Sequence, residues 1–227
     1  MNSSTHPRLA LTALRLPLGT AALDCDLGIP DSACGLVIFA HGSGSSRHSP
    51  RNRFVAEALH EQHIATLLLD LLTLEEEHLD QQTAHIRFNI ELLAERLVRA
   101  TDWVLNEPRT HNLRLGYFGA STGAGAAMLA AAQRPRQIAA VVSRGGRPDL
   151  ALEVLGQVQA PTLLLVGGRD YPVIELNREA LDRLTAAEER RLVIVPGATH
   201  LFQEPGMLEE VARLAGDWFG RWFTKSE

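Results

Sequence analysis

Short apolar runs alternate along the chain with longer segments in which apolar residues recur every three or four positions. The runs predict buried strands at 35–40, 64–72, 113–118, 137–143, 161–166 and 191–195. The helical spacing covers 50–59, 85–105, 124–132, 149–157, 174–185 and a C-terminal segment. Two partly alternating strands, at 8–16 and 20–25, come first. This order predicts an α/β fold with a mostly parallel central sheet and helices on both faces.

Small and polar residues gather in loops that directly follow the predicted strands. These loops lie at 41–46, 119–123, 144–149, 167–170 and 196–200. Because the carboxyl ends of parallel strands meet at one edge of a sheet, we expect the five loops to lie together there. The strand at 64–72 is instead followed by an acidic stretch around Glu75–Glu77, which we expect to form a solvated loop or the start of a helix rather than a binding site.

The segment from Leu113 to Ala132 reads as a strand, a sharp turn and a helix, with Ser121 at the turn. Gly119 and Gly123 form a G-x-S-x-G pattern around it, and small residues are needed where strand and helix approach closely. Such a turn lifts a serine hydroxyl clear of the sheet and makes it a candidate nucleophile. The alternative is a glycine-rich turn with an incidental serine.

A serine hydroxyl is a weak nucleophile until a positioned base takes its proton. In the order Ser, then Asp or Glu, then His, the base must follow Ser121, and His200 is the only one of the nine histidines that does. Its alternative role is a surface histidine that caps the last helix. The post-strand position selects Asp170 as the orienting acid, with Asp149 as the runner-up.

The oxyanion of a tetrahedral intermediate needs N–H donors that are already in place. Thr122, the residue after the nucleophile, is one candidate, and Ser43 in the loop 41–44 is the other. That loop is alternatively a plain glycine turn or a phosphate-binding loop, although it lacks the Gly-Lys-Ser/Thr ending of a P-loop. Arg144 is a candidate for binding a substrate carboxylate, and an ion pair with a nearby acidic residue is the alternative.

Composition limits the other functions. The chain has 227 residues, 45% hydrophobic and 22% charged, which predicts one globular domain over 1–227. A net charge of −5 gives no electrostatic footprint for nucleic acid. No apolar stretch approaches the ~18 residues that suggest a membrane span. The polar start, residues 1–8, makes a poor signal peptide, so a cytoplasmic protein with free thiols at Cys25 and Cys34 is expected.

Two further histidines, His60 and His63, are the candidates for a metal site. His60 and His63 are three residues apart rather than the four of H-E-x-x-H, so no metal site is expected there. No cofactor is expected either.

The aromatic residues of the last predicted helix fit either the core or a dimer face, and the core is favoured, which leaves a monomer or a homodimer. They are Trp218, Phe219, Trp222 and Phe223.

Taken together, the ordered motifs resemble those of the α/β-hydrolase superfamily, and most closely its dienelactone-hydrolase-like branch. The motifs are residues 41–44, 119–123, 167–170 and 196–200. The resemblance implies an α/β-hydrolase fold, and the short segment 144–160 leaves no room for a cap domain. Dienelactone hydrolases proper carry cysteine where this chain has Ser121, so a serine esterase acting on small esters is the safer expectation. Thioesters, lactones or peracids, or a binding module without chemistry, are the alternatives.

Overall fold

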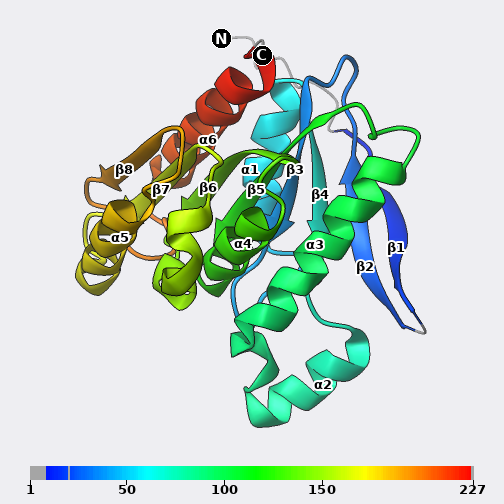
Figure 1. Ribbon diagram of the computed structural model, residues 1–227, viewed down its shortest axis with the longest axis horizontal. Helices are drawn as coiled ribbons and strands as arrows, with labels where there is room; N and C mark the ends of the chain where they lie inside the picture. The colour runs from blue at the N-terminus through cyan, green and yellow to red at the C-terminus, as the bar shows by residue number, and fades with distance from the viewer. Residues whose placement is uncertain (1–8, 20, 226–227) are drawn as a thin grey trace.

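The computed structural model describes residues 9–19 and 21–225, and Figure 1 shows how their elements are arranged. Eight strands form one sheet in the order β1-β2-β4-β3-β5-β6-β7-β8. They are β1 (Thr12–Leu18), β2 (Ala21–Gly28), β3 (Gly35–Ala40), β4 (Ile64–Leu69), β5 (Arg114–Ala120), β6 (Ile138–Arg144), β7 (Thr162–Gly167) and β8 (Arg190–Val195). β2 pairs antiparallel with both β1 and β4, whereas β3 to β8 all run parallel to one another. The predicted mostly parallel sheet is confirmed.

Helices cover both faces of this sheet, as predicted. They are α1 (Pro50–Glu61), α2 (Leu74–Thr83), α3 (Ile90–Asn106), α4 (Thr122–Gln133), α5 (Tyr171–Arg183) and α6 (Met207–Thr224), with 3-10 segments η1 (Ile86–Phe88) and η2 (Pro148–Gln157). α1 packs against α6 on one face, while α3, α4, η2 and α5 pack in succession on the other (Figure 1). Between β6 and β7 the described chain holds η2 and no separate cap domain.

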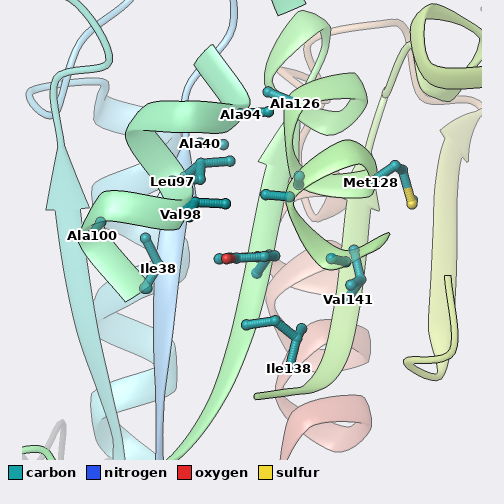
Figure 2. Close-up of a cluster of buried hydrophobic side chains, with 14 of the residues drawn as sticks. Ile38, Ala40, Ala94, Leu97, Val98, Ala100, Ala126, Met128, Ile138 and Val141 are labelled. Carbon is teal, nitrogen blue, oxygen red and sulfur yellow. The ribbon is translucent and has the colours of Figure 1, made fainter. Parts of the chain in front are cut away.

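Alternate residues of the central strands feed two separate parts of the core. In β3, Ile38 joins the cluster under α3 and α4, whereas Val37 and Phe39 join the cluster under α1 and α6. This alternation follows from the two-residue period of a strand, and both faces are apolar because both are covered. Figure 2 shows Ala94 of α3 close to Ala126 of α4, where small side chains let the two helices approach.

The aromatic residues of α6 belong to the core, as the sequence favoured. Trp218, Phe219, Trp222 and Phe223 are at most 5% exposed. A methyl group added at Gly35 would lie 2.2 Å from the Phe223 ring, so this strand residue lacks a side chain where the ring packs. The helix therefore docks against a sheet surface shaped to receive it.

The acidic residues after β4 form the first turn of helix α2 and not a loop, so the helix-start alternative is the correct one, and the helix continues to Thr83. The Thr73 side chain accepts the N–H of Glu76, and the Glu76 carboxylate accepts the N–H of Thr73, which is a capping box. In Figure 1 α2 stands beyond the edge of the sheet, apart from the other helices. Helix α3 begins at Ile90 rather than at residue 85. The predicted polar start at 1–8 lies outside the described residues.

Candidate active site

Five loops meet at the carboxyl edge of the parallel strands, as the sequence predicts. They follow β3, β5, β6, β7 and β8, which are adjacent in the sheet and parallel. Candidate side chains that are far apart in the chain thus lie at one edge, with β5 and its serine near the middle.

Ser121 lies at a strained turn between β5 and α4. Its φ is 50° and its ψ is −122°, a conformation that residues with a side chain rarely adopt. The two flanking glycines lack a side chain where the backbone leaves no space for one. A Cβ at Gly123 would lie 2.3 Å from the carbonyl oxygen of Ala40, and one at Gly119 would lie 2.5 Å from Ala124 Cα. The close approach of three backbone segments therefore fixes the elbow and presents the hydroxyl at the edge of the sheet.

Asp170 and His200 come together at the same edge. The Asp170 Oδ2 atom lies 2.6 Å from His200 Nδ1, so the carboxylate accepts a hydrogen bond from that nitrogen. The Asp170 side chain is 13% exposed and that of His200 is 38% exposed. A Cβ at Gly145 would lie 3.5 Å from the imidazole, so the ring packs against this loop. Asp149, the alternative acid, is instead held by the Arg147 guanidinium at 2.8 Å.

Ser121 and His200 line one cavity of about 240 Å³, which we call the Ser121 cavity. Its lining comes from the loop after β3, the first turn of α1, the elbow, β6 and the loop after β8: Gly42, Ser43, Ser45, Ser49, Arg51, Asn52, Ala120, Ser121, Arg144, His200 and Leu201. The structure shows no direct hydrogen bond between the Ser121 hydroxyl and the His200 imidazole, a contact that often forms fully with substrate in place.

The two candidate oxyanion donors lie side by side. The Ser43 N–H donates to Thr122 Oγ1 at 2.9 Å, so the loop after β3 is tied to the first turn of α4. The Thr122 N–H belongs to that first turn, where N–H groups have no intrahelical acceptor. The Thr122 hydroxyl thus holds the Ser43 N–H beside the first turn of α4.

A buried histidine holds the same loop from behind. His41 Nε2 accepts the N–H of Leu71 at 3.0 Å, so its Nδ1 carries the proton and donates to the Gly42 carbonyl at 2.9 Å. Burial lowers the pKa of His41, which favours the neutral ring that this pattern requires. The imidazole therefore fixes the loop to the end of β4.

Arg144 ends β6 and reaches into the Ser121 cavity. Its residue is 7% exposed, and Nη2 donates to Asn52 Oδ1 at 3.4 Å. Burial, with a smaller contribution from the charge of Arg51, lowers the Arg144 pKa well below its usual value, to about 10. The alternative of an ion pair holds for Arg147, which binds Asp149, and not for Arg144. Arg51 and Asn52 belong to no motif in the sequence, and the only indication of their place is the predicted helix start after the 41–46 loop.

A second cavity of about 260 Å³ lies on the other side of the 42–46 loop, and we call it the α2 cavity. Its lining combines the loop after β3 with the end of β4, α2 and α3: His41, Gly42, Ser43, Gly44, Ser45, Ser46, Asp70, Leu71, Leu72, Glu77, Asp80, Gln81, Arg87, Leu93 and Thr122. Arg87 donates to the Asp80 carboxylate at 2.5 Å, which secures the end of α2. The helix missed by sequence analysis thus forms a wall beside the candidate oxyanion donors.

The described residues contain neither a metal-binding group nor a membrane-spanning helix. Over 9–19 and 21–225, no group of three or more His, Cys, Asp or Glu side chains is arranged to hold a metal ion. Within those ranges no helix combines the length and the apolar character needed to cross a bilayer. Cys25 and Cys34 are both free thiols.

The sheet order and the central elbow define an α/β-hydrolase fold. Residues 32–222 match the dienelactone hydrolase family. The chain therefore belongs to the dienelactone hydrolase family, as the sequence motifs suggested.

Solved structures agree with this assignment. A dienelactone hydrolase from Anabaena variabilis is 57% identical, covers 95% of this chain and 99% of its own, and superposes with a TM-score of 0.92. Est1E from Butyrivibrio proteoclasticus shares the fold at 17% identity, with a TM-score of 0.78 over 94% of this chain and 99% of its own. A second structure of Est1E contains ferulic acid.

The curated relatives are longer proteins. A putative phosphoribosyl transferase of Mycobacterium tuberculosis (strain H37Rv) is 53% identical over 219 residues. The match covers 96% of this chain and 48% of that protein, so the chain spans about half the length of the curated relatives it matches.

Proposed function

We propose that this protein is a serine hydrolase that cleaves small carboxylic esters through an acyl-enzyme on Ser121. The observation that carries the proposal is the 2.6 Å contact between Asp170 and His200, at a cavity whose wall also holds the elbow serine. Family membership supports hydrolysis, while the phosphoribosyl transferase in the relative's name describes a protein twice as long.

In the first half of the reaction, Ser121 Oγ attacks the ester carbonyl carbon while His200 Nε2 takes the hydroxyl proton. The carbonyl electrons move onto oxygen, and the N–H groups of Thr122 and Ser43 stabilise the resulting oxyanion. The oxyanion then collapses, the bond to the alkoxy oxygen breaks, and the alcohol leaves with the proton from His200. The Asp170 carboxylate keeps Nδ1 protonated and stabilises the imidazolium.

In the second half, water takes the place of the alcohol. His200 removes one proton from this water as its oxygen attacks the acyl carbon, and the same two N–H groups hold the second oxyanion. The bond to Ser121 Oγ breaks, the serine recovers its proton from His200, and the carboxylic acid departs. No oxidant, reductant or metal enters the balance.

The dimensions of the site favour compact substrates. The Ser121 cavity and the α2 cavity measure about 240 and 260 Å³, and no cap domain covers them within the described chain. Thioesters follow the same steps with a thiol as the leaving group, and lactones follow them with the alcohol still attached to the acyl chain after the ring opens. Turnover of a matched ester and thioester with identical acyl groups will identify which class is preferred.

The test is hydrolysis of p-nitrophenyl acetate together with labelling by a fluorophosphonate probe. We expect the purified protein to turn over the ester and to carry the label on Ser121, located by mass spectrometry of the labelled peptide. Ser121→Ala should lose both. Retention of the full rate in Ser121→Ala, or no labelling of the native protein, would show that the serine is not the nucleophile.

A further inference from the structure

Helix α2 is held to the molecule by polar contacts, although it has no apolar face to bury. Both of its leucines are more than half exposed. Asp80, by contrast, is 3% exposed and accepts the backbone N–H of Arg87 at 2.9 Å. Arg96 of α3 donates to Glu76 of α2 at 2.8 Å. Core formation therefore does not account for this helix, whereas its position as a wall of the α2 cavity does.

Three leucine side chains give the α2 cavity an apolar interior. Leu71 and Leu93 are buried in the protein, and Leu72 is half-buried. A hydrocarbon group that enters a cavity of about 260 Å³ displaces water from such surface, and this displacement favours binding. The cavity is therefore suited to a compact apolar part of a ligand.

The charge of the α2 cavity is negative and comes from Glu77. Two other acidic residues in the lining are neutralised, because Arg47 binds the Asp70 carboxylate and Arg87 binds that of Asp80. In the part of the chain that the structure describes, the Glu77 carboxylate has neither a hydrogen bond nor an ion pair. An anionic group in this cavity would therefore meet an unneutralised negative charge.

The proposed ester hydrolysis determines which half of an ester faces this cavity. The alcohol oxygen takes its proton from His200, which lines the Ser121 cavity and not the α2 cavity. The carbonyl oxygen points to the N–H groups of Ser43 and Thr122, and both of these residues line the α2 cavity. The acyl chain takes the remaining position on the carbonyl carbon, and the open space beyond the two N–H donors is the α2 cavity.

We propose that the α2 cavity is the acyl subsite and accepts compact, uncharged hydrocarbon acyl groups, while Glu77 disfavours acyl groups that end in a carboxylate. The inference rests on the proposed ester hydrolysis and names its substrate class. The acyl chain lies against Leu72 and Leu93, and the alcohol lies on the His200 side. Helix α2 then sets the acyl preference, although it supplies none of the reacting groups.

The first test measures how kcat/KM depends on the length of the acyl chain. The substrates are p-nitrophenyl acetate, butanoate, hexanoate and octanoate, which share one leaving group. Burial of each added methylene should raise kcat/KM by about fourfold until the cavity is full, so butanoate should exceed acetate by roughly tenfold. Equal values for all four esters, or a steady decrease with length, would overturn the proposal.

Two substitutions change the size of the cavity in opposite directions. Leu72→Trp fills part of it and should lower the ratio of butanoate to acetate kcat/KM by about fivefold, whereas Leu93→Ala should raise the ratio of octanoate to butanoate by a similar factor. Leu79→Trp is the control, because Leu79 lies on α2 but is 53% exposed and lines neither cavity. Leu72 is half-buried, so its variant tests the proposal even where Leu93→Ala folds poorly. Unchanged ratios in both variants, or the same changes in Leu79→Trp, would overturn the proposal.

A second comparison tests the charge of the cavity. Ethyl 5-methylhexanoate and ethyl hydrogen glutarate differ only at the end of the acyl chain, which is an isopropyl group in one and a carboxylate in the other. We expect the neutral ester to have the higher kcat/KM by tenfold or more. Glu77→Gln should reduce this preference at least threefold, and Glu75→Gln, an exposed residue of α2 outside the cavity, should leave it unchanged. Equal reduction by both variants, or by neither, would overturn the role of Glu77.

A trapped intermediate locates the acyl chain directly. Ser121 Oγ attacks phosphorus in methyl p-nitrophenyl hexylphosphonate and p-nitrophenolate leaves, so the hexyl chain on the bound phosphonate stands for the acyl chain. A crystal structure of this adduct should show the chain between Leu72 and Leu93, and a chain in the Ser121 cavity would overturn the proposal. If Ser121 is not labelled and no ester is hydrolysed, the hydrolase proposal fails and takes the acyl subsite with it. If esters are hydrolysed at Ser121 but the chain lies elsewhere, the acyl subsite fails alone.

Discussion

Replacing Arg144 by methionine should make the protein more stable in a buffer free of multivalent anions. The pKa of Arg144 falls well below the usual arginine value, to about 10, because the guanidinium is buried and faces Arg51. One pKa unit corresponds to about 1.4 kcal/mol, so the charged side chain costs the fold about 3 kcal/mol. A base whose folded-state pKa is depressed destabilises the fold at every pH below that value. The cost applies in full at pH 7 and fades only as the pH rises above about 10 towards the usual arginine pKa.

The expected gain is smaller than this cost. Arg144→Met also loses the 3.4 Å contact with Asn52 and leaves that buried amide oxygen without its donor, a loss of about 1 kcal/mol for so long a contact. The net stabilisation is then about 2 kcal/mol. For a chain of this size it corresponds to a rise in Tm of roughly 4 to 8 °C.

Urea denaturation at pH 7, in a buffer without phosphate or sulfate, measures the difference directly. Arg178→Met is the control, since its exposed ion pair with Glu175 should change stability by no more than about 1 kcal/mol. A variant that is less stable than the native protein without anions would refute the reasoning, because the guanidinium would then have a favourable partner within the fold.

Three other substitutions test the site and the fold around it. Asp170→Asn should lower kcat by roughly 10² to 10⁴-fold with little change in stability, since it removes the acceptor for His200 Nδ1, whereas activity near the native level would exclude Asp170 as the orienting acid. Gly123→Ala should destabilise the protein by about 3 kcal/mol or more, because its Cβ would lie 2.3 Å from a backbone oxygen, and a normal urea midpoint would contradict this packing. Burial lowers the pKa of His60 from 6.5 to about 4, so the unfolded chain takes up a proton that the folded chain refuses and stability falls as the pH drops from 6.5 towards 4. His60→Gln should flatten that part of the stability profile, and parallel profiles for both proteins would rule the residue out as the cause.

The parts of the fold that could be predicted are those whose signal is local and periodic. Strands such as β3 and β5 are covered on both faces and therefore appear as continuous apolar runs. Ser121, Asp170 and His200 each follow a predicted strand, and parallel pairing brings such positions to one edge of the sheet.

Helix α2 was missed because it lacks the feature on which helix prediction depends. Its apolar residues Leu74 and Leu79 are 60% and 53% exposed, so they form no buried stripe. The informative signal was the capping box of Thr73 and Glu76, which is a local pattern.

The pairing of cations in the Ser121 cavity was unpredictable for a different reason. Arg51 and Arg144 are on different elements, and their proximity depends on how the first turn of α1 packs beside β6. No sequence spacing encodes that packing. The same holds for the Ser43 N–H, whose bond to Thr122 joins residues 79 positions apart.

The loop after β3 lies between the Ser121 cavity and the α2 cavity, whose lining residues are otherwise different. Of the described residues that line the Ser121 cavity and the α2 cavity, Gly42, Ser43 and Ser45 are common to both, and all three belong to this loop. An ester held across the loop would place its acid and its alcohol in different surroundings, one rich in arginine and the other bounded by α2 and α3. On the proposed ester hydrolysis, a substitution in one of these two cavities should then change recognition of one half of the substrate and leave recognition of the other half unchanged.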